Sequence, residues 1–455
     1  MPAICDLSKM KNVYFAGIGG ISMSSLALIL KNKGIAVSGY DFKESETTKM
    51  LEENGIAIDY TYEDALFPDA DTVVYTAALG QDDPILVRAR ARERGLDIFT
   101  RAELLGAITS DYKHSVGVAG THGKSSTTGF LAEICLAANN DSTILAGAVM
   151  PSVGSTFTVG NGDCAVFEAC EYKNSYHSMQ PTIKTILNVE LDHVDFFGNL
   201  ENVIESFRKY IAKPGKNGEN IAVINLDSEN AVKSAENTGA DVKCFSIKEK
   251  TDYYARNIDL SDGYGEFDIM KKDELLCHVK LSVPGIHNVA NATAAAASAD
   301  LCEIDACAIK AGLEKFIGVK RRFEKVMTLD NGAIVIDDYA HHPDEITVTL
   351  NSAKKVAKGK VICIFQPHTY SRTKALFDDF VTALSIADKV LMAPIYAARE
   401  TDTLGVSSDD VAREIKNAEC LHTFGELRDR AEELAEKGDL VITMGAGDVY
   451  KVFQE

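Results

Sequence analysis

The sequence predicts an α/β fold in which several parallel sheets are covered by helices. Short apolar runs alternate with longer helix-compatible stretches along the chain, which is typical of strand–helix–strand crossovers. Glycine-rich or polar clusters follow several of these runs, as they do where parallel strands end at a ligand-binding edge. The 455 residues correspond to about three domains at roughly 100–200 residues each.

The composition excludes several classes of protein. A net charge of -20 gives the chain no general attraction for a phosphate backbone, so we expect no nucleic-acid partner. The apolar runs are far shorter than the roughly 18 residues that a membrane span needs. The N-terminus lacks the basic and apolar regions of a secretory signal. The ten cysteines form no C-x-x-C pair. We therefore expect a cytoplasmic protein with reduced thiols.

The first unit opens with a buried strand at residues 13–16, a glycine turn, a helix at about 22–33 and a second strand at 37–40. The turn contains Gly17, Ile18, Gly19 and Gly20, and Asp41 ends the second strand. This spacing imitates a dinucleotide-binding fingerprint, although Ser22 occupies the place of the third glycine. The pattern alone leaves nicotinamide binding, pyrophosphate binding and tight packing open.

A phosphate-binding loop is predicted after the strand at residues 115–119. The loop runs from Gly120 through Gly123 to Lys124 and Ser125, and a helix-compatible stretch covers 127–137. Backbone N–H groups and the helix N-terminus would face phosphate oxygens, Lys124 would contact the terminal phosphates, and the Ser125 hydroxyl would ligate Mg²⁺. Val118 stands where the strict motif has a glycine, so the strand–loop–helix context carries the prediction.

Carboxylates and a histidine follow the next two strands of the second unit. The strand at residues 164–167 delivers Glu168, with Glu171 shortly after it, and the strand at 183–188 leads to Asp192 and His193. Parallel strands end at one edge of a sheet, so these groups should lie beside the phosphate loop. Glu168 and His193 are therefore candidate Mg²⁺ ligands.

The third unit contains strands at residues 333–336, 361–365, 390–393 and 440–444. Polar clusters at 337–343 and 366–373 follow two of them and predict a ligand crevice. The adjacent His341 and His342 lack a third candidate ligand for zinc. A loop at 213–218 is read as internal to the second unit, and a basic segment at 318–322 as a boundary. The predicted domains are 1–110, 111–318 and 319–455.

The set of motifs and their order resemble the Mur ligases of peptidoglycan synthesis, from about residue 12 to the C-terminus. Each motif is short, but their number and order make the resemblance specific. The segments that carry it are 17–20, 119–124, 168–171, 192–195, 284–291, 321–323, 337–343, 365–368, 396–398 and 445–448.

The resemblance implies a three-domain architecture: a Rossmann-like N-terminal domain for a UDP-sugar, a central P-loop ATPase domain and a C-terminal Rossmann-like domain for the amino acid. It implies a UDP-sugar site, and no nicotinamide, at Gly17, Ile18, Gly19, Gly20 and Asp41. It implies that Mg²⁺ binds Ser125, Glu168 and His193, and that the catalytic residues are Lys124, His193, Arg322, His342 and Arg372. The implied ATP site consists of Gly120, Thr121, His122, Gly123, Lys124, Ser125, Ser126, His287, Asn288, Asn291 and Arg322.

The resemblance is strongest to the branch of the family that adds alanine. It implies that ATP and Mg²⁺ support the joining of L-alanine to the lactyl carboxylate of UDP-N-acetylmuramate through an acyl phosphate, in a monomer or homodimer. Phe207 and Arg208 stand where other Mur ligases have a carbamylated lysine, which fits this branch, and Cys170 replaces a common Asp. The alternatives are a recycling ligase for a preformed peptide, a nicotinamide-dependent dehydrogenase and a non-catalytic nucleotide-binding protein.

Overall fold

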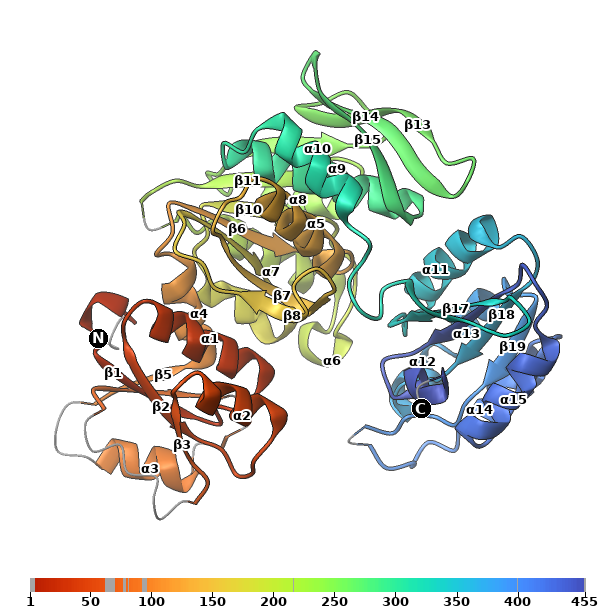
Figure 1. Cartoon of the computed structure of the whole chain (residues 1–455), viewed down its shortest axis with the longest axis horizontal. Coiled ribbons are helices and arrows are strands. Elements are labelled where there is room, and N and C mark those ends of the chain that lie inside the picture. The colour runs from red at the N-terminus through yellow and green to blue at the C-terminus, as the bar shows by residue number, and fades with distance from the viewer. Residues whose placement is uncertain are drawn as a thin grey trace.

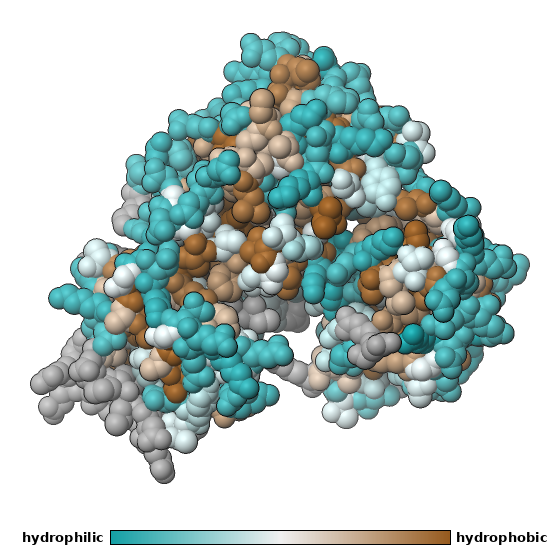
Figure 2. Space-filling view, viewed as in Figure 1, coloured by the Kyte–Doolittle hydropathy of each residue, from teal (hydrophilic) through white to brown (hydrophobic). Residues whose placement is uncertain are grey.

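The computed structural model describes residues 5–61, 70–76, 79–80, 82–91, 96–215, 217–398 and 400–453. Three α/β units follow one another along the chain, and the first and third lie on opposite sides of the central one (Figure 1). In the space-filling view a hollow separates the first lobe from the third (Figure 2). Within the described part of the chain, no helix is long and apolar enough to cross a membrane.

The first unit holds a parallel sheet, and its described strands have the order β3-β2-β1-β4-β5. Capping boxes at Ser45 and Thr100 begin α2 and α4, because each side chain accepts a hydrogen bond from a free N–H of the first turn. The elements are η1 (Leu7–Lys9), β1 (Asn12–Ala16), α1 (Ile21–Asn32), β2 (Ala36–Tyr40), α2 (Glu46–Glu53), β3 (Ala57–Asp59), β4 (Thr72–Tyr75), α3 (Pro84–Ala91), β5 (Asp97–Thr100) and α4 (Arg101–Thr109).

The central sheet has the order β15-β14-β13-β12-β11-β10-β6-β9-β7-β8 among the described strands. Its middle is parallel, and β6 is buried on both faces, as its continuous apolar run predicts. The elements are β6 (His114–Ala119), α5 (Lys124–Ala137), β7 (Thr143–Met150), β8 (Ser155–Thr158), β9 (Cys164–Glu168), η2 (Tyr172–Ser178), β10 (Ile183–Ile186), α6 (Val194–Phe197), α7 (Leu200–Ile211), β11 (Ile221–Asn225), α8 (Glu229–Ala235), β12 (Asp241–Ser246), β13 (Tyr253–Asp259), β14 (Tyr264–Lys271), β15 (Glu274–Pro284), α9 (Ile286–Leu301) and α10 (Ala306–Lys315).

The third sheet is doubly wound, with the order β16-β17-β21-β18-β19-β20 in the described residues and only β16 antiparallel to its neighbour. The elements are β16 (Glu324–Thr328), β17 (Ile334–Asp338), α11 (Pro343–Val356), β18 (Val361–Phe365), α12 (Tyr370–Ala375), α13 (Phe377–Leu384), β19 (Lys389–Met392), α14 (Ser408–Glu414), β20 (Ala418–Cys420), α15 (Phe424–Leu434), β21 (Leu440–Met444) and η3 (Val449–Phe453).

The structure confirms the predicted alternation, although several elements begin or end a few residues from their expected bounds. The strand expected at 183–188 ends at Ile186, because the chain turns there toward the phosphate loop. The strand expected at 333–336 extends through Asp338, so Asp337 and Asp338 belong to the sheet rather than to the loop after it. The antiparallel strands β13 to β15 were not predicted. Their alternating burial is that of a sheet with one solvated face.

The apolar cores join the first two units and leave the third separate. One buried cluster combines Leu104 and Ile108 of the first unit with Tyr176 and Phe207 of the central one. The two clusters of the third unit draw only on described residues between 323 and 453. Packed apolar side chains therefore fix the first unit to the central one. The third unit shares no such apolar cluster with the central unit among the described residues.

We expect Gly106→Ala to destabilise the junction between the first two units. A Cβ at Gly106 in α4 would lie 1.9 Å from the carbonyl oxygen of Ser178, and backbone cannot move aside as a flexible side chain can. Overpacking of this kind costs about 1–3 kcal/mol. Gly425→Ala in α15 is the matched control, because its Cβ meets open space and alanine favours a helix by up to about 1 kcal/mol. Equal urea midpoints for the two variants would contradict the assignment.

Candidate active site

The phosphate loop is fixed by hydrogen bonds to the end of β10 and by close packing on α9. Asn188 Oδ1 accepts from the backbone N–H of His122 at 2.8 Å, and its Nδ2 donates to the His122 carbonyl at 3.1 Å. Gly123 has a φ of +85°, and a Cβ there would lie 2.6 Å from Asn291 Oδ1. A side chain at Gly123 would therefore be both strained and obstructed, so glycine is required.

Lys124 points back over the loop and pairs with Glu171. Its ammonium donates to the carbonyls of Gly120 at 2.5 Å and Thr121 at 3.0 Å, and the Glu171 carboxylate lies within 3.2 Å. Burial opposes the charge on Lys124, but Glu171 raises the pKa of the lysine above its usual value. The lysine is thus charged and oriented before any substrate binds.

Two candidate metal ligands lie at the rim of the loop. Ser125 is in the first turn of α5, and Glu168 is the last residue of β9. Glu168 Oε2 accepts from the N–H of Gly147 at 2.8 Å, which fixes the carboxylate. Both residues line one cavity. A hydroxyl and a carboxylate are the hard oxygen donors that Mg²⁺ prefers, so these residues fit the ion.

His193 lies beside Glu171 and does not line the cavity. Its Nε2 is 3.7 Å from Glu171 Oε1 and 3.8 Å from Asp192 Oδ2, and its ring lies 4.6 Å from that of Tyr172 between centroids. Its backbone φ is +50°, a left-handed conformation, and its N–H donates to Asp192 Oδ1 at 2.6 Å. His193 is thereby held toward the Lys124–Glu171 pair.

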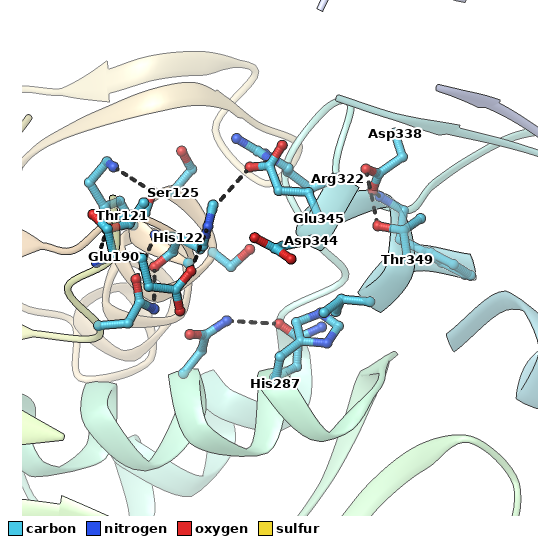
Figure 3. Close-up of a pocket in the computed structure, with 18 of the residues that line it drawn as sticks. Thr121, His122, Ser125, Glu190, His287, Arg322, Asp338, Asp344, Glu345 and Thr349 are labelled. Carbon is cyan, nitrogen blue, oxygen red and sulfur yellow. Dashed lines mark hydrogen bonds and ion pairs between the residues drawn. The ribbon is translucent and has the colours of Figure 1, made fainter. Parts of the chain in front are cut away.

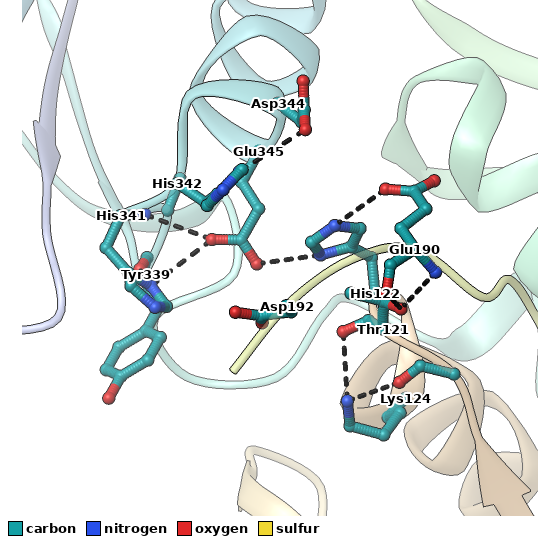
Figure 4. Close-up of polar contacts among 12 residues, drawn as sticks. Thr121, His122, Lys124, Glu190, Asp192, Tyr339, His341, His342, Asp344 and Glu345 are labelled. Carbon is teal, nitrogen blue, oxygen red and sulfur yellow. Dashed lines mark hydrogen bonds and ion pairs between the residues drawn. The ribbon is translucent and has the colours of Figure 1, made fainter. Parts of the chain in front are cut away.

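His122 lies between two carboxylates from different units (Figure 4). Its Nε2 is 3.3 Å from Glu190 Oε2, and its Nδ1 is 3.3 Å from Oε1 of Glu345 in α11. Burial opposes the charge on His122, but these two hydrogen bonds raise the pKa of its imidazole to about 9. The hydrogen bond from His122 lowers the pKa of Glu190 in turn. The three groups form a carboxylate–imidazolium–carboxylate bridge.

The wall opposite the phosphate loop belongs to the third unit (Figure 3). Arg322 Nη1 lies 3.9 Å from Glu345 Oε1. Burial raises the pKa of Asp338 to about 6, although Arg322 acts to lower it. Asp338 accepts from the backbone N–H groups of Phe323 and Ala340 at 2.7 and 2.8 Å. This carboxylate therefore holds the backbone that presents Arg322.

The third wall is the start of α9 (Figure 3). Burial lowers the pKa of His287 to about 4, so its ring is neutral. Its buried Nδ1 has no hydrogen-bond partner in the part of the chain that the structure describes. Asn288 donates to the Pro284 carbonyl at 2.8 Å, and Asn291 donates to Asn288 Oδ1 at 3.2 Å. This wall offers a neutral ring and amide groups to a ligand.

The cavity of about 320 Å³ enclosed by these walls brings together most of the side chains predicted for the ATP site. Glu190, Asp338, Asp344, Glu345 and Thr349 also line it. Of the residues predicted for ATP, Gly120 does not line it. Glu168, predicted as a metal ligand, does. The predicted ATP-site residues that line it are Thr121, His122, Gly123, Lys124, Ser125, Ser126, His287, Asn288, Asn291 and Arg322.

His342 and Arg372 lie outside this cavity, in the third unit. His342 precedes the first turn of α11, with its Nδ1 3.4 Å from Asp344 Oδ2. Arg372 is in α12, and its buried Nη1 lacks a hydrogen-bond partner among the described residues. Burial opposes the charge on Asp192, but His193, Arg372 and His342 together lower its pKa. Asp192 of the central unit therefore lies within electrostatic reach of both predicted residues.

The first glycine turn is far from this cavity in the chain and is organised by Asp41. Gly17 has a φ of +82°, and Gly20 immediately precedes α1. Asp41 accepts from the N–H of Gly19 at 2.8 Å and from that of Phe42 at 2.9 Å. Both carboxylate oxygens of Asp41 therefore bind backbone N–H groups. This fits the possibility that the glycine turn serves tight packing. A role toward a bound UDP-sugar stays a prediction.

Known families match nearly the whole chain. The Mur ligase family, catalytic domain matches residues 12–113, the Mur ligase middle domain matches 118–299, and the Mur ligase, glutamate ligase domain matches 321–447. The chain belongs to the Mur ligase family. The nicotinamide and non-catalytic alternatives have no such support.

Curated relatives of this Mur ligase match it end to end. It is 43% identical over 447 residues to UDP-N-acetylmuramate–L-alanine ligase of Caldicellulosiruptor bescii, covering 97% of each chain. It is 45% identical over 457 residues to the ligase of the same name from Lachnospira eligens, covering 99% of this chain and 98% of the relative.

Solved structures show the same three-unit fold. UDP-N-acetylmuramate–alanine ligase from Thermotoga maritima is 28% identical, covers 97% of each chain and has a TM-score of 0.76. A murein peptide ligase from Psychrobacter arcticus is 23% identical, covers 98% of this chain and 97% of its own, and has a TM-score of 0.65. At that identity the second likeness concerns the fold alone.

The sequence reasoning did not assign Glu190 and Glu345 to the site of this Mur ligase. Glu190 lies in the polar segment that follows β10. Because β10 is parallel to β6, this position at the same edge of the sheet as the phosphate loop could have identified it. Glu345 is in the first turn of α11, where an acidic residue is also expected simply to favour the helix dipole. Its contact with His122 depends on how two units meet.

We expect the imidazole of His122 to titrate near pH 9. A histidine whose folded pKa lies above its unfolded value of 6.5 stabilises the fold fully below pH 6.5, and this contribution is lost as pH rises through about 9. Histidine-labelled protein should show the titration by NMR, and the signal absent from His122→Gln identifies it. The free energy of unfolding of the native chain, relative to that variant, should fall through the same pH range. A midpoint at or below 6.5 would contradict the bridge.

Proposed function

We propose that the chain is an ATP-dependent ligase that joins L-alanine to the lactyl carboxylate of UDP-N-acetylmuramate in peptidoglycan precursor synthesis. The observation that carries the proposal is the cavity between the central and third units. It combines a charged Lys124, a serine–carboxylate pair and Arg322 in a chain that is similar from end to end to ligases with this activity. We further propose that it acts in the cytoplasm, as a monomer or homodimer.

We assign the ATP triphosphate to the loop at Gly120–Ser126 and its nucleoside to the start of α9. N–H groups at the start of α5 face phosphate oxygens, and the helix dipole adds partial positive charge. The neutral His287 and the amides of Asn288 and Asn291 suit an uncharged adenosine better than a phosphate. The UDP-sugar would bind at Gly17–Gly20, where a glycine turn also precedes a helix.

The residues at the rim of the loop fit Mg²⁺. Ser125 and Glu168 would hold one ion, and His193 would hold a second close to Glu171. Bound Mg²⁺ would neutralise part of the phosphate charge. Glu171 orients Lys124 rather than a metal in this assignment, because its carboxylate is already committed to the lysine ammonium.

The chemical problem is that two anions must approach each other. The lactyl carboxylate attacks the γ-phosphorus, a P–O bond forms to that oxygen, and ADP leaves to give an acyl phosphate. Lys124 from one wall and Arg322 from the other would lower the repulsion. The alanine amine then attacks the acyl carbon, the C–N bond forms and inorganic phosphate leaves.

The alanine ammonium must lose a proton before it can attack. His342 is our candidate base, since it begins α11 on the side of the third unit that faces Asp192, with Asp344 close to its Nδ1. Arg372 would bind the alanine carboxylate, since its buried Nη1 is unpartnered in the described structure. Both residues lie outside the ATP cavity. This is required if alanine binds at a site separate from the nucleotide.

We expect phosphate release from ATP to require UDP-N-acetylmuramate and an amino acid, with L-alanine preferred over glycine and L-serine. A tripeptide should give no release, because the proposed acceptor is a single amino acid. Each acceptor would be compared at equal concentration in a coupled phosphate assay. No release with any amino acid would refute the proposal, and release with the tripeptide alone would identify a recycling ligase.

We expect Lys124→Ala to lower kcat by at least about 100- to 1,000-fold, the effect of removing one preorganised charge at a reacting group. Lys209→Ala is the matched control. Its ammonium is on the surface of α7, where the side chain is 64% exposed, and it should leave kcat unchanged. Circular dichroism would establish that both variants fold. A Lys124→Ala enzyme with near-native turnover would rule out the phosphate role of this lysine.

A further inference from the structure

His122 contacts the third unit from within the phosphate loop. The residue is three positions after Ala119, where β6 ends, and its ring meets Glu345 on α11 while also contacting Glu190 (Figure 4). Residue 122 lies in the loop after a strand of the central sheet, and residue 345 lies in a helix of the third unit, whose sheet and apolar cores are separate. The imidazole of His122 thus connects two units that do not share an apolar core.

Both ring nitrogens of His122 face carboxylate oxygens at 3.3 Å. Only the imidazolium form has an N–H on each nitrogen, so only this form donates to both carboxylates. A neutral ring would leave one nitrogen lone pair against a negative oxygen. The geometry therefore selects the charged ring.

Glu345 is fixed from the other side. Its Oε2 accepts from the N–H of His341 at 3.1 Å, which closes the first turn of its own helix. Its side chain is only 16% exposed, and Oε1 faces both His122 and Arg322. Burial opposes the charge on Glu345, but His122, His341 and Arg322 hold its pKa well below its usual range. The carboxylate is thus charged, and its partners lie on both units.

The bridge also offsets part of the negative charge of the proposed ATP cavity, which Glu168, Asp338 and Asp344 line as well. Glu190 and Glu345 both line the space that we assign to ATP. Without His122, two carboxylates would face a triphosphate across a partly buried site, where like charges repel strongly. With His122 between them and Arg322 beside Glu345, two positive groups balance two negative ones. The cavity is then able to accept a polyanion.

We propose that Glu190, His122 and Glu345 form a clamp that holds the third unit against the phosphate loop, and that His122 is a positioning residue rather than a phosphate ligand. The proposal rests on the proposed function in one respect, that ATP occupies the cavity that the clamp closes. When the units separate, His122 keeps Glu190 and loses Glu345. Because Arg322 belongs to the same unit as Glu345, the clamp places Arg322 at the nucleotide only when the units are closed.

The test is a double-mutant cycle with His122→Gln and Glu345→Gln. Each single change should raise the KM for ATP about tenfold and prevent the compaction on ATP-analogue binding that small-angle X-ray scattering detects in the native enzyme. The double variant should be no worse than either single one. The coupling would then be about tenfold, or about 1.4 kcal/mol. Glu414→Gln at the exposed last residue of α14 removes the same charge and should behave like the native enzyme.

Glu345→Asp keeps the charge on a shorter side chain and should give an intermediate KM with partial compaction. This variant separates the clamp from a general effect on folding, because it changes only the reach of the carboxylate. Additive effects of the two glutamine substitutions, or native compaction in either single variant, would overturn the clamp. Compaction needs nucleotide but no ligation. If the enzyme ligated no amino acid but both single variants still lost compaction with the ATP analogue, and the double variant lost no more, the clamp would be supported and only the proposed function refuted.

Discussion

The proposed function requires a chain with a net charge of -20 to bind polyanions, and the site is organised by that constraint. The positive groups in and around the cavity each lie close to a carboxylate. Lys124 pairs with Glu171, His122 pairs with Glu190 and Glu345, and Arg322 lies 3.9 Å from Glu345. Carboxylate partners keep partly buried cations charged and oriented. The donors are therefore in place before the substrate, which is what electrostatic stabilisation of a transition state requires.

The parallel sheet brings these groups together from distant parts of the sequence. Strands β9, β6 and β10 are neighbours, and their carboxyl ends lead to Glu168, to the phosphate loop and to Glu190. Because the strands are parallel, three segments that start near residues 120, 168 and 188 meet at one edge. The glycine at 123 then allows α9 to approach the loop, so the wall that we propose for the nucleoside depends on the same close packing.

Sequence patterns predicted what depends on local structure and on the edges of single sheets. The strands at 361–365 and 440–444 have the expected bounds, because each is a short run of buried apolar residues. The side chains expected around the phosphate loop line one cavity for the same reason. The partner of His122 could not be predicted, since an acidic residue in the first turn of α11 has an ordinary explanation within its own helix. Only the arrangement of two units reveals its second contact.

The contacts between the units indicate that two units form a rigid body and that the third can move. The first and central units share a buried apolar core, so the distance between the glycine turn at 17–20 and the phosphate loop is fixed. The third unit has its own core, and the contact at His122 is polar, so water can replace it when the units separate. The unit that carries Arg322, His342 and Arg372 is thus suited to move. A histidine in the phosphate loop is well placed to couple that movement to the nucleotide, because it belongs to the fixed part and contacts the moving one.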